Sequence, residues 1–260
     1  MSAILYYGEP NGASFTVLAA LEESRLNIET RYLDLLSGAR HRIVGLTDRV
    51  ALDMGVEGEG PVLVINGEAM TESVFIAQYL DEAGAGHMQP KDAHTHWQML
   101  MWCRRVTERA APAAAFLGCR SNAHTKLAAI SEAAFADLTA HIVSPDLKAR
   151  WEALRRGDFQ QAQEEDSIAK ISDLAALCNT QLGDGRDWLI GDYSIADLVT
   201  YGWLAGMRGI VPDAFADRSK LAVWFARVEA RPSVQRALAH AIAAHPGQHW
   251  APGPEINRWG

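Results

Sequence analysis

The sequence predicts two structural parts, an α/β part over residues 1–85 and an all-α part over residues 86–260. Short β-rich runs alternate with helix-like segments before residue 85, whereas almost no strand pattern follows that point. A glycine-rich break, AGAGHMQPKD at 83–92, separates the two patterns. We therefore expect two domains that meet near residue 86.

The first domain is expected to begin with a strand at Ala3–Tyr7, which the turn-forming sequence GEPNG ends. Apolar residues then recur at roughly helical spacing as far as Leu26. Ser14 stands at the start of this helical pattern, and serine is a favourable N-cap. A second strand is expected at Ile28–Leu33, followed by a loosely defined helix at Arg40–Leu52.

A β-hairpin is expected next, with Pro61–Ile65 as its first strand and Asn66-Gly67 as its turn. Ala69–Met70 lies in the returning strand, and an amphipathic helix follows over Thr71–Ala83. Two strands joined by a helix pair in parallel, and the hairpin adds an antiparallel pair. The order β-α-β-α-β-β-α thus predicts a mixed sheet with the thioredoxin-like arrangement.

The second domain is expected to be helical throughout, with helices at about residues 92–118, 123–142, 146–156, 160–182, 194–207, 219–229 and 232–243. In GDYSIADL at 191–198, Ser194 and Asp197 have the spacing of a capping box, with Asp in place of Glu. Tyr193 and Leu198 occupy the positions of a hydrophobic staple. We interpret this motif as a structural cap without a catalytic role.

Charge and composition exclude several classes of partner. The formal net charge of -8 argues against nucleic acid, because a duplex-binding protein needs a clustered basic surface. The absence of a basic leader and of an apolar run of about 18 residues predicts a cytoplasmic protein without a membrane partner. The spacing of Cys103, Cys119 and Cys178 indicates reduced core thiols, and the histidines lack zinc-site spacing, so no metal is expected.

Two short motifs in the first domain suit a peptide-like ligand. Glu72-Ser73 begins a helix, whose free N–H groups attract a carboxylate while the Glu72 carboxylate can accept from an ammonium. Taken alone, such a pair is more often a helix cap. Gly60-Pro61 begins a strand; a cis bond there would turn backbone groups toward a ligand, whereas a trans proline would merely begin the strand.

The complete order, with Gly-Pro before the third strand, Glu-Ser before the next helix and SIAD in the helical domain, resembles the cytosolic glutathione S-transferases over essentially the whole chain. Within that family it is similar to the bacterial β-etherase branch, which uses glutathione in lignin degradation. Three stretches carry this likeness, EPNGASFTVLAAL at 9–21, PKDAHTHWQMLMWCRR at 90–105 and SPDLKARWEALRRGDF at 144–159. The last is an insertion relative to most transferases.

The resemblance implies catalytic roles for residues near the first turn. Ser14 lies where serine-type transferases place the hydroxyl that hydrogen-bonds the glutathione sulfur, although it can also be a plain N-cap. A hydroxyl donor at a helix N-terminus would stabilise the thiolate, the nucleophilic form of a thiol whose pKa is about 8.5. Asn11 is a second candidate donor, and Tyr6 and Tyr7 are weaker ones.

The resemblance also implies a set of glutathione contacts. Gly60 and Pro61 would pair with the cysteinyl backbone, and Glu72 and Ser73 would hold the γ-glutamyl end. Arg40 and His41 would face the glycyl carboxylate, although each alone is more often a solvated surface residue. The sequence departs from the family at ALDMGVEGEGP, where relatives commonly read Asn-Pro-x-Gly-x-Val-Pro, and at Ala13, where close relatives can carry a polar residue.

The second substrate is expected in the cleft between the domains, along the helix that begins near residue 92. Candidate apolar wall residues are Met99, Trp102, Cys103, Val106 and Phe116, which share a spacing that is also typical of plain core. The tail at 245–260 has two tryptophans, which we expect over this cleft or over a dimer partner.

The family likeness implies an enzyme that cleaves β-aryl ethers of lignin-derived aromatics, with glutathione as co-substrate and an aromatic small molecule as substrate. Attack by the thiolate would release an aryloxide. One alternative is a weakly active or silent subunit, paired as a homodimer or heterodimer with a homologue, which the altered ALDMGVEGEGP stretch and Ala13 favour. Another is a general detoxifying or ligand-carrying transferase.

Overall fold

A four-stranded mixed sheet forms the centre of the N-terminal part. The computed structural model describes residues 2–43 and 60–253 of the chain. The strands lie in the order β2-β1-β3-β4, with β1 parallel to β2 and antiparallel to β3. Their bounds are β1 Ala3–Tyr7, β2 Glu29–Tyr32, β3 Val62–Ile65 and β4 Glu68–Met70. The predicted mixed sheet of thioredoxin-like order is confirmed.

The side chains of the sheet alternate between two faces. Leu5 of β1 lies opposite Leu63 of β3, and both belong to the main core beneath the helices. Tyr6 lies opposite Val62, and these two form a smaller cluster on the other face. Between β3 and β4, Asn66 and Gly67 both have positive φ, as the expected Asn-Gly turn requires.

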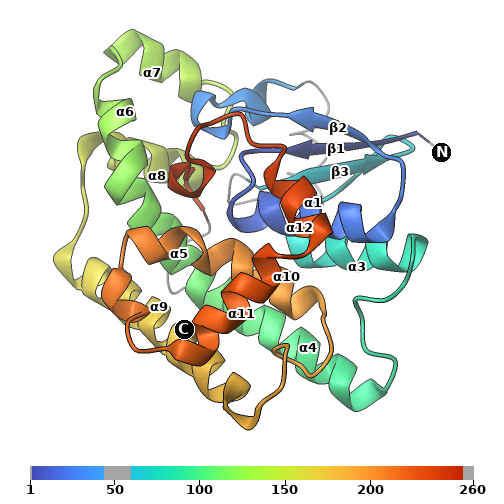
Figure 1. Cartoon of the computed structure of the whole chain (residues 1–260). Helices are drawn as coiled ribbons and strands as arrows, with labels where there is room; N and C mark the ends of the chain where they lie inside the picture. Colours follow the sequence, from blue (N-terminus) through green and yellow to red (C-terminus); the bar gives the residue numbers. More distant parts are fainter. Residues whose placement is uncertain (1, 44–59, 254–260) are drawn as a thin grey trace.

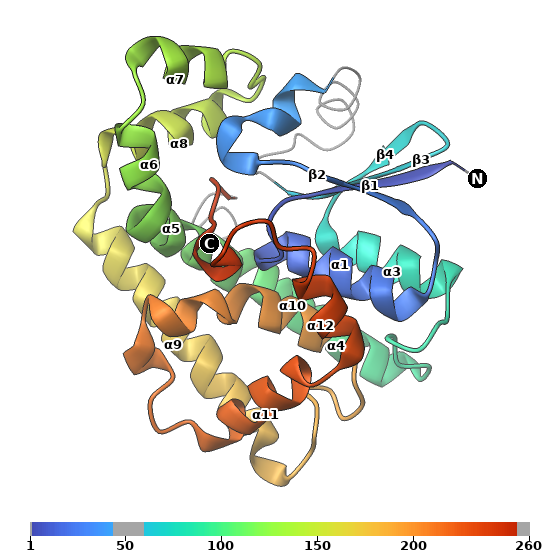
Figure 2. The same ribbon diagram turned by 45° about the horizontal axis from the view of Figure 1, so that its top comes forward.

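Two helices, α1 (Gly12–Ser24) and α3 (Ser73–Ala83), cover the main-core face of the sheet (Figure 2). Helix α1 is buried almost throughout, because α10 and α12 pack on its other sides. In the described part of the helix expected at Arg40–Leu52, the chain forms a short 3₁₀ turn, Ala39–Arg42, instead of an α-helix; another 3₁₀ turn, Leu35–Ser37, precedes it. The remainder of that expected helix lies outside the described residues.

The C-terminal part is built from helices (Figure 1). Three of them, α4, α5 and α6, follow one another directly through two π-helical turns, Val106–Ala110 and Cys119–Ala123. The bounds are α4 Ala93–Arg105, α5 Ala111–Gly118, α6 His124–Ala128, α7 Glu132–Thr139, α8 Pro145–Arg156, α9 Gln161–Gln181, α10 Ile195–Leu204, α11 Ser219–Glu229 and α12 Pro232–Leu238. The prediction of an all-α part is confirmed, with the helix expected at 123–142 replaced by α6 and α7. The predicted boundary near residue 86 falls between α3 and α4 and stays a prediction.

The predicted capping box lies at the start of α10 and is confirmed. The Ser194 N–H donates to Asp197 Oδ2 at 3.0 Å. The Leu189 N–H and the Trp224 indole N–H donate to Asp197 Oδ1 at 3.1 and 2.8 Å. Full burial raises the pKa of Asp197 to about 6, although these donors act in the opposite direction. The motif therefore joins three segments of the helical domain through one buried carboxyl group.

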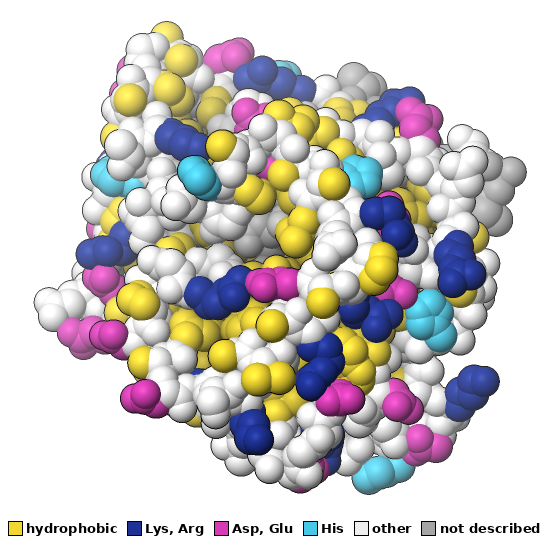
Figure 3. All heavy atoms as spheres, viewed as in Figure 1, with side chains coloured by type: hydrophobic (Ala, Val, Ile, Leu, Met, Phe, Trp, Pro, Cys, Tyr) yellow, Lys and Arg dark blue, Asp and Glu magenta, His cyan; other side chains and the backbone are white. Residues whose placement is uncertain are grey.

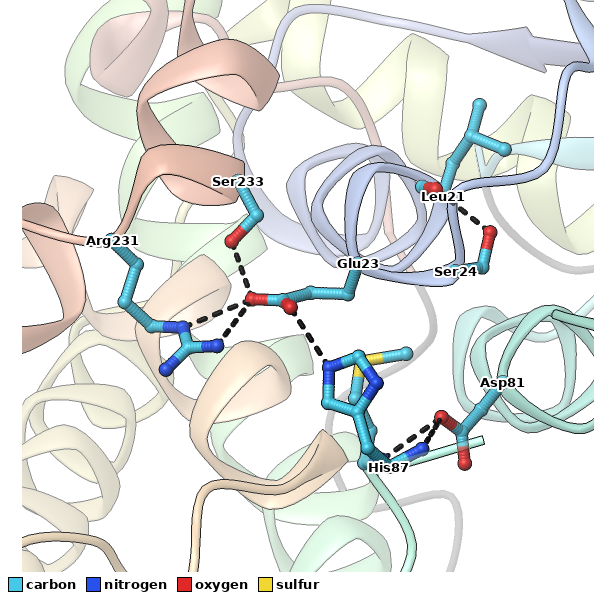
Figure 4. Close-up of polar contacts among 8 residues, drawn as sticks. Leu21, Glu23, Ser24, Asp81, His87, Arg231 and Ser233 are labelled. Atoms are coloured by element: carbon cyan, nitrogen blue, oxygen red, sulfur yellow. Dashed lines mark hydrogen bonds and ion pairs between the residues drawn. The ribbon is translucent and has the colours of Figure 1, made fainter. Parts of the chain in front are cut away.

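A second buried carboxylate joins the two domains (Figure 4). Glu23 of α1 accepts two hydrogen bonds from the Arg231 guanidinium, at 2.7 and 2.9 Å, and one from the Ser233 hydroxyl. His87 Nε2 lies 3.0 Å from its other oxygen. Although burial opposes ionisation, these donors lower the pKa of Glu23 below its usual value. We call these four residues the Glu23 junction.

The three cysteines are buried and form no disulfide, as expected. Burial raises the pKa of the Cys103 thiol to about 12 and raises those of Cys119 and Cys178 as well, so these thiols are poor nucleophiles. Among the described residues, no helix is both long and apolar enough to cross a membrane. On the face shown in Figure 3, basic and acidic side chains are interspersed rather than gathered into a basic patch.

Candidate functional site

The candidate catalytic group lies where the chain passes from β1 into α1. The β1–α1 loop (Gly8–Asn11) ends at Asn11, which is the N-cap of α1, so Ser14 is the third helical residue rather than the N-cap. Ser14 is buried, and its Oγ accepts a hydrogen bond from the Gly8 N–H at 2.9 Å. A hydroxyl that accepts one hydrogen bond can still donate one. The Ser14 hydroxyl is thus held at a helix N-terminus, the environment that lowers the pKa of a thiol.

Asn11, the second predicted donor, is engaged elsewhere. Its Nδ2 donates to the carbonyl oxygen of His249 at 3.0 Å. The weaker candidates are also engaged: the Tyr6 hydroxyl accepts from Arg31 at 3.3 Å, and the Tyr7 hydroxyl lies 3.3 Å from His240 Nδ1. Burial and then the charge of Glu9 raise the pKa of Tyr7, so its phenol stays neutral. Of the predicted donors, Ser14 is the one whose hydroxyl lies in the first turn of α1.

The Glu-Ser pair stands at the start of α3 in an unusual backbone conformation. Glu72 is the N-cap and has φ 65 and ψ 105, a combination that costs a non-glycine residue conformational energy. Ser73 is the first helical residue and is buried. Desolvation raises the pKa of the Glu72 carboxyl, and the charge of Arg40 opposes this effect. A strained residue beside a helix N-terminus is typical of a ligand-binding position.

Arg40 therefore lies within electrostatic reach of Glu72, although the sequence suggests that they face opposite ends of the ligand. Arg40 and the adjacent His41 are both buried rather than solvated. Sequence reasoning missed the pairing because 31 residues separate the two groups and no local pattern links them. A buried guanidinium near a carboxylate indicates an organised polar site instead of a free surface charge.

The Gly60–Pro61 bond is trans. Of the two alternatives, the one in which the proline merely begins the strand therefore holds. Pro61 is buried directly before β3, at the position where a proline removes no ladder hydrogen bond from the strand interior. Gly60 borders open space, since a Cβ built there would meet no atom within 4 Å. The altered stretch before it, residues 51–59, lies outside the described residues.

A pocket of about 360 Å³ lies between α5, α8 and the C-terminal segment, a name we use for residues 242–253. Its aromatic walls are Phe116 and Phe159, whose rings meet edge to face at 5.6 Å. Asp146, Arg150 and Asp158 supply charged groups at its border. Its volume is in the range of small-molecule sites. Helix α8 belongs to the stretch 144–159, so the predicted insertion forms one wall of this pocket, which we call the α5–α8 pocket.

Four of the five predicted wall residues are buried in the core, and the fifth lines the α5–α8 pocket. Met99, Cys103 and Val106 are fully buried in the core. Trp102 is also buried, and its indole N–H donates to Thr200 Oγ1 of α10 at 2.9 Å. Their helical spacing is that of the core-facing stripe of α4, which α10 covers. Phe116 alone of the five lines the α5–α8 pocket.

The C-terminal segment contacts the β1–α1 loop through His249 and lines the α5–α8 pocket with Pro252 and Gly253. The His249 carbonyl meets Asn11, Trp250 is buried with its ring 6.0 Å from that of Trp203, and Gly253 lies against Ala115. Trp250 also packs so closely on Gly118 that a Cβ there would come within 2.2 Å of its ring. The tail tryptophan Trp250 thus lies on its own chain.

Sequence reasoning missed Glu9, which we had interpreted only as part of a turn. Its buried carboxylate accepts from the Tyr32 hydroxyl at 2.9 Å and from the backbone N–H groups of Ile242 and Ala243 at 3.2 and 2.9 Å. These two amides lie more than 230 residues away along the chain, so no local signal identifies them. A glutamate beside proline in a turn predicts only local structure.

The arrangement of the two parts defines a class: a thioredoxin-like sheet followed by helices, with a hydroxyl at the first helix, is the glutathione S-transferase fold. Residues 14–87 match the family model described as the glutathione S-transferase N-terminal domain, so the resemblance seen in the sequence is confirmed.

Particular relatives extend this likeness to the whole chain. Protein LigF of Sphingobium sp. strain SYK-6 is 24% identical over 246 residues, which span 90% of this chain and 92% of LigF. The crystal structure of beta-etherase LigF matches with a TM-score of 0.80 and 22% identity, covering 93% of this chain and 100% of that one. Glutathione transferase F7 from Populus trichocarpa matches with a TM-score of 0.64 and 19% identity, covering 91% and 98%. A Burkholderia graminis glutathione transferase with two bound glutathione molecules per subunit matches with a TM-score of 0.64 and 20% identity, covering 92% and 88%.

Proposed function

We propose that this protein is a glutathione transferase that cleaves β-aryl ether bonds of lignin-derived aromatics. The observation that carries the proposal is the Ser14 hydroxyl, fixed by the Gly8 N–H at the start of α1 in a glutathione S-transferase N-terminal domain. Glutathione is the co-substrate in this proposal, which is supported by the similar glutathione transferase structures that hold bound glutathione or glutathione disulfide. The aryl ether is inferred from beta-etherase LigF, which shares the overall structure.

Ser14 acts on the sulfur in this proposal. A thiol with a pKa of about 8.5 is mostly protonated at neutral pH, so the site must stabilise the thiolate. The Ser14 hydroxyl donates a hydrogen bond to the sulfur, and the N–H groups at the start of α1 add partial positive charge. The thiolate attacks the carbon that bears the aryloxy group, a C–S bond forms, and the C–O bond breaks. The aryloxide leaves with the bonding electron pair and takes a proton from solvent.

The other predicted residues hold the tripeptide. Ser73 and Glu72 bind the γ-glutamyl end, where the buried Arg40 stabilises the ionised Glu72. Gly60 and Pro61 offer backbone groups to the cysteinyl part. His41, buried beside Arg40, completes the site toward the glycyl end. Binding of the whole tripeptide places its sulfur at Ser14, which turns a bimolecular attack into a positioned one.

The α5–α8 pocket is the place we assign to the aromatic substrate. Phe116 and Phe159 give it an aromatic wall, and edge-to-face rings of this kind pack well against a further ring. The charged groups Asp146 and Asp158 can accept from substrate hydroxyls. This assignment makes the helix α8 insertion a determinant of substrate choice.

A weakly active or silent subunit is the second candidate, and one observation favours it. One N–H of the Asn11 amide is used by the His249 carbonyl, which leaves the second predicted donor with one N–H for a sulfur and turns its amide toward the C-terminal segment. A subunit of this kind would still bind glutathione but would turn over slowly. A general detoxifying transferase is the third candidate, and substrate comparison separates it from the first.

Incubation with glutathione and each enantiomer of a β-aryl ether tests the proposal. We expect release of phenol from one enantiomer by the wild-type protein and a large loss in Ser14→Ala. Faster turnover of a generic electrophilic arene than of either ether would favour the detoxifying transferase. Retention on immobilised glutathione without turnover of any substrate would favour the silent subunit, and failure to be retained would contradict glutathione binding altogether.

Self-association is also part of the proposal. Phe75 on α3 and Trp97 and Met101 on α4 are large apolar side chains that are 56%, 56% and 44% exposed. Trp97 and Met101 lie one turn apart on α4, and exposed apolar groups of this size mark interaction surfaces. We expect a dimer through α3 and α4, which light scattering of the wild-type protein and of Phe75→Glu would test. A wild-type monomer at all concentrations would contradict it.

A further inference from the structure

We infer that Glu9 is a positioning residue of the thiol site, which it holds by joining the β1–α1 loop to the C-terminal segment. The inference rests on the proposed function, because it concerns the place where the glutathione sulfur would meet Ser14. Glu9 is only 7% exposed and lies next to Gly8, whose N–H fixes the Ser14 hydroxyl. A displacement of this loop therefore moves the one donor that orients Ser14.

The hydrogen bonds of Glu9 span three parts of the chain. One carboxylate oxygen accepts from the Tyr32 hydroxyl and from the Ala243 N–H, both at 2.9 Å, and the other accepts from the Ile242 N–H at 3.2 Å. Glu9 thus ties the end of β2 and the C-terminal segment to the loop before α1. The buried partner is Glu9, whose carboxylate would be costly to leave without hydrogen bonds, so the tie is a defined geometry rather than a loose contact.

A second contact fixes the same pair of segments at the other end of the loop. Asn11 donates to the His249 carbonyl at 3.0 Å, and the next residue, Trp250, is buried against Gly118 and Trp203. The loop is therefore bound to the C-terminal segment on both sides of Pro10. Anchoring at two points restrains rotation as well as translation of Gly8 and of the first turn of α1.

The pKa values of several groups around Glu9 are shifted by burial and by its charge. Burial and the hydrogen bond to Glu9 raise the pKa of Tyr32, and burial and the charge of Glu9 raise that of Tyr7, so both phenols remain protonated. Burial and Lys126 lower the pKa of His249, with Glu9 and Asp34 acting in the opposite direction. A negative charge at Glu9 would by itself raise the pKa of a nearby thiol, whereas the positioning of the loop by Glu9 would lower that pKa.

Because the charge of Glu9 and its positioning of the loop have opposite effects on the thiol pKa, substitution of Glu9 distinguishes them. The pKa of glutathione bound to the wild-type protein, to Glu9→Gln and to Glu9→Asp is measured by ultraviolet absorbance of the thiolate. Gln removes the charge and one acceptor oxygen. Asp keeps the charge, but its side chain is one methylene shorter, so its carboxylate no longer reaches the partners of Glu9. We expect both substitutions to raise the pKa of the bound thiol by about one, a tenfold smaller ratio of thiolate to thiol. Glu22→Gln is the matched control for the thiol pKa, since Glu22 pairs with Arg236 and, at 3.8 Å, with His240.

Other results would overturn the inference. A lower thiol pKa in Glu9→Gln with no change in Glu9→Asp would show that Glu9 acts by charge alone. Lower thermal stability with an unchanged thiol pKa in both would show a merely structural role. Hydrogen exchange supplies a readout without glutathione: we expect faster exchange in residues 5–20 and in 240–253 of both Glu9 variants, and unchanged protection would also overturn the inference. A wild-type protein that does not lower the thiol pKa would instead contradict the proposed function.

Discussion

Two buried glutamates join the N-terminal domain to C-terminal residues, and they do so in different chemical ways. Glu23 accepts from an arginine, a serine and a histidine side chain, whereas Glu9 accepts from two backbone amides and a tyrosine. The Arg231 guanidinium adds the attraction of opposite charges to its two hydrogen bonds with Glu23, whereas the donors to Glu9 are neutral. Backbone donors give position, because they cannot move without moving the chain. We interpret the Glu23 junction as the stabilising contact and the Glu9 contact as the one that sets site geometry.

Removal of the Glu23 carboxylate should have the largest effect on stability. In Glu23→Ala we expect a loss of about 3 kcal/mol in the free energy of unfolding, because Arg231 and Ser233 lose their common partner. The figure is at the low end for buried pairs, since the Arg231 side chain is 27% exposed. Urea denaturation measures it. A stable variant whose bound glutathione has an altered thiol pKa would contradict the division of roles between the two glutamates.

Ser14→Ala should reduce catalytic activity far more than it reduces stability. We expect kcat/KM to fall about a hundredfold, as when one stabilising donor is removed, while stability falls by only about 1–2 kcal/mol. The loss of stability follows because the substitution leaves one buried backbone N–H, that of Gly8, without its partner. Steady-state kinetics and thermal unfolding of the same preparation give both values. Retained activity together with a large loss of stability would show that Ser14 has a structural role instead of a catalytic one.

A substitution beside Trp250 should displace the C-terminal segment, to which Glu9 binds, without changing Glu9 itself. Gly118→Ala puts a Cβ within 2.2 Å of the Trp250 ring, so the indole must move, at a cost of about 1–3 kcal/mol. Gly183→Ala is the matched control, since a Cβ at Gly183 meets no atom within 4 Å. We expect faster proteolysis of the C-terminal segment in the first variant and no change in the second. Equal proteolysis of both would mean that Trp250 does not anchor the segment.

The pH dependence of stability should separate Glu23 from Asp197. The pKa of Glu23 is lowered from 4.5, so its stabilising contribution is present above pH 4.5 and is lost as pH falls below it. The pKa of Asp197 is raised from 3.8 to about 6, so stability decreases as pH rises between these values, by at most about 1.4 kcal/mol per pH unit. Denaturant titrations from pH 3 to 7 should lose the first slope in Glu23→Gln and the second in Asp197→Asn. Parallel curves for all three proteins would contradict both assignments.

Local patterns predicted the order of elements, the Asn-Gly turn and the Ser194–Asp197 cap, because each depends on residues a few positions apart. They did not predict the Glu9 contact with Ile242, or the electrostatic pairing of Arg40 with Glu72, since these contacts join distant segments. Helical spacing identified the buried stripe of α4 but could not say what covers it. The stripe packs against α10, and four of the five predicted wall residues are buried there or in the following turn, so their role as substrate walls stays a prediction.

The pKa of the glutathione thiol in complex with the wild-type protein and with Ser14→Ala tests the central claim most directly. We predict a value well below about 8.5 for the wild-type complex and a return toward the free value in Ser14→Ala, with tripeptide binding retained. The same low pKa in both proteins would show that the Ser14 hydroxyl does not stabilise the thiolate. A thiol pKa in the wild-type complex equal to that of free glutathione would contradict the proposed transferase function itself.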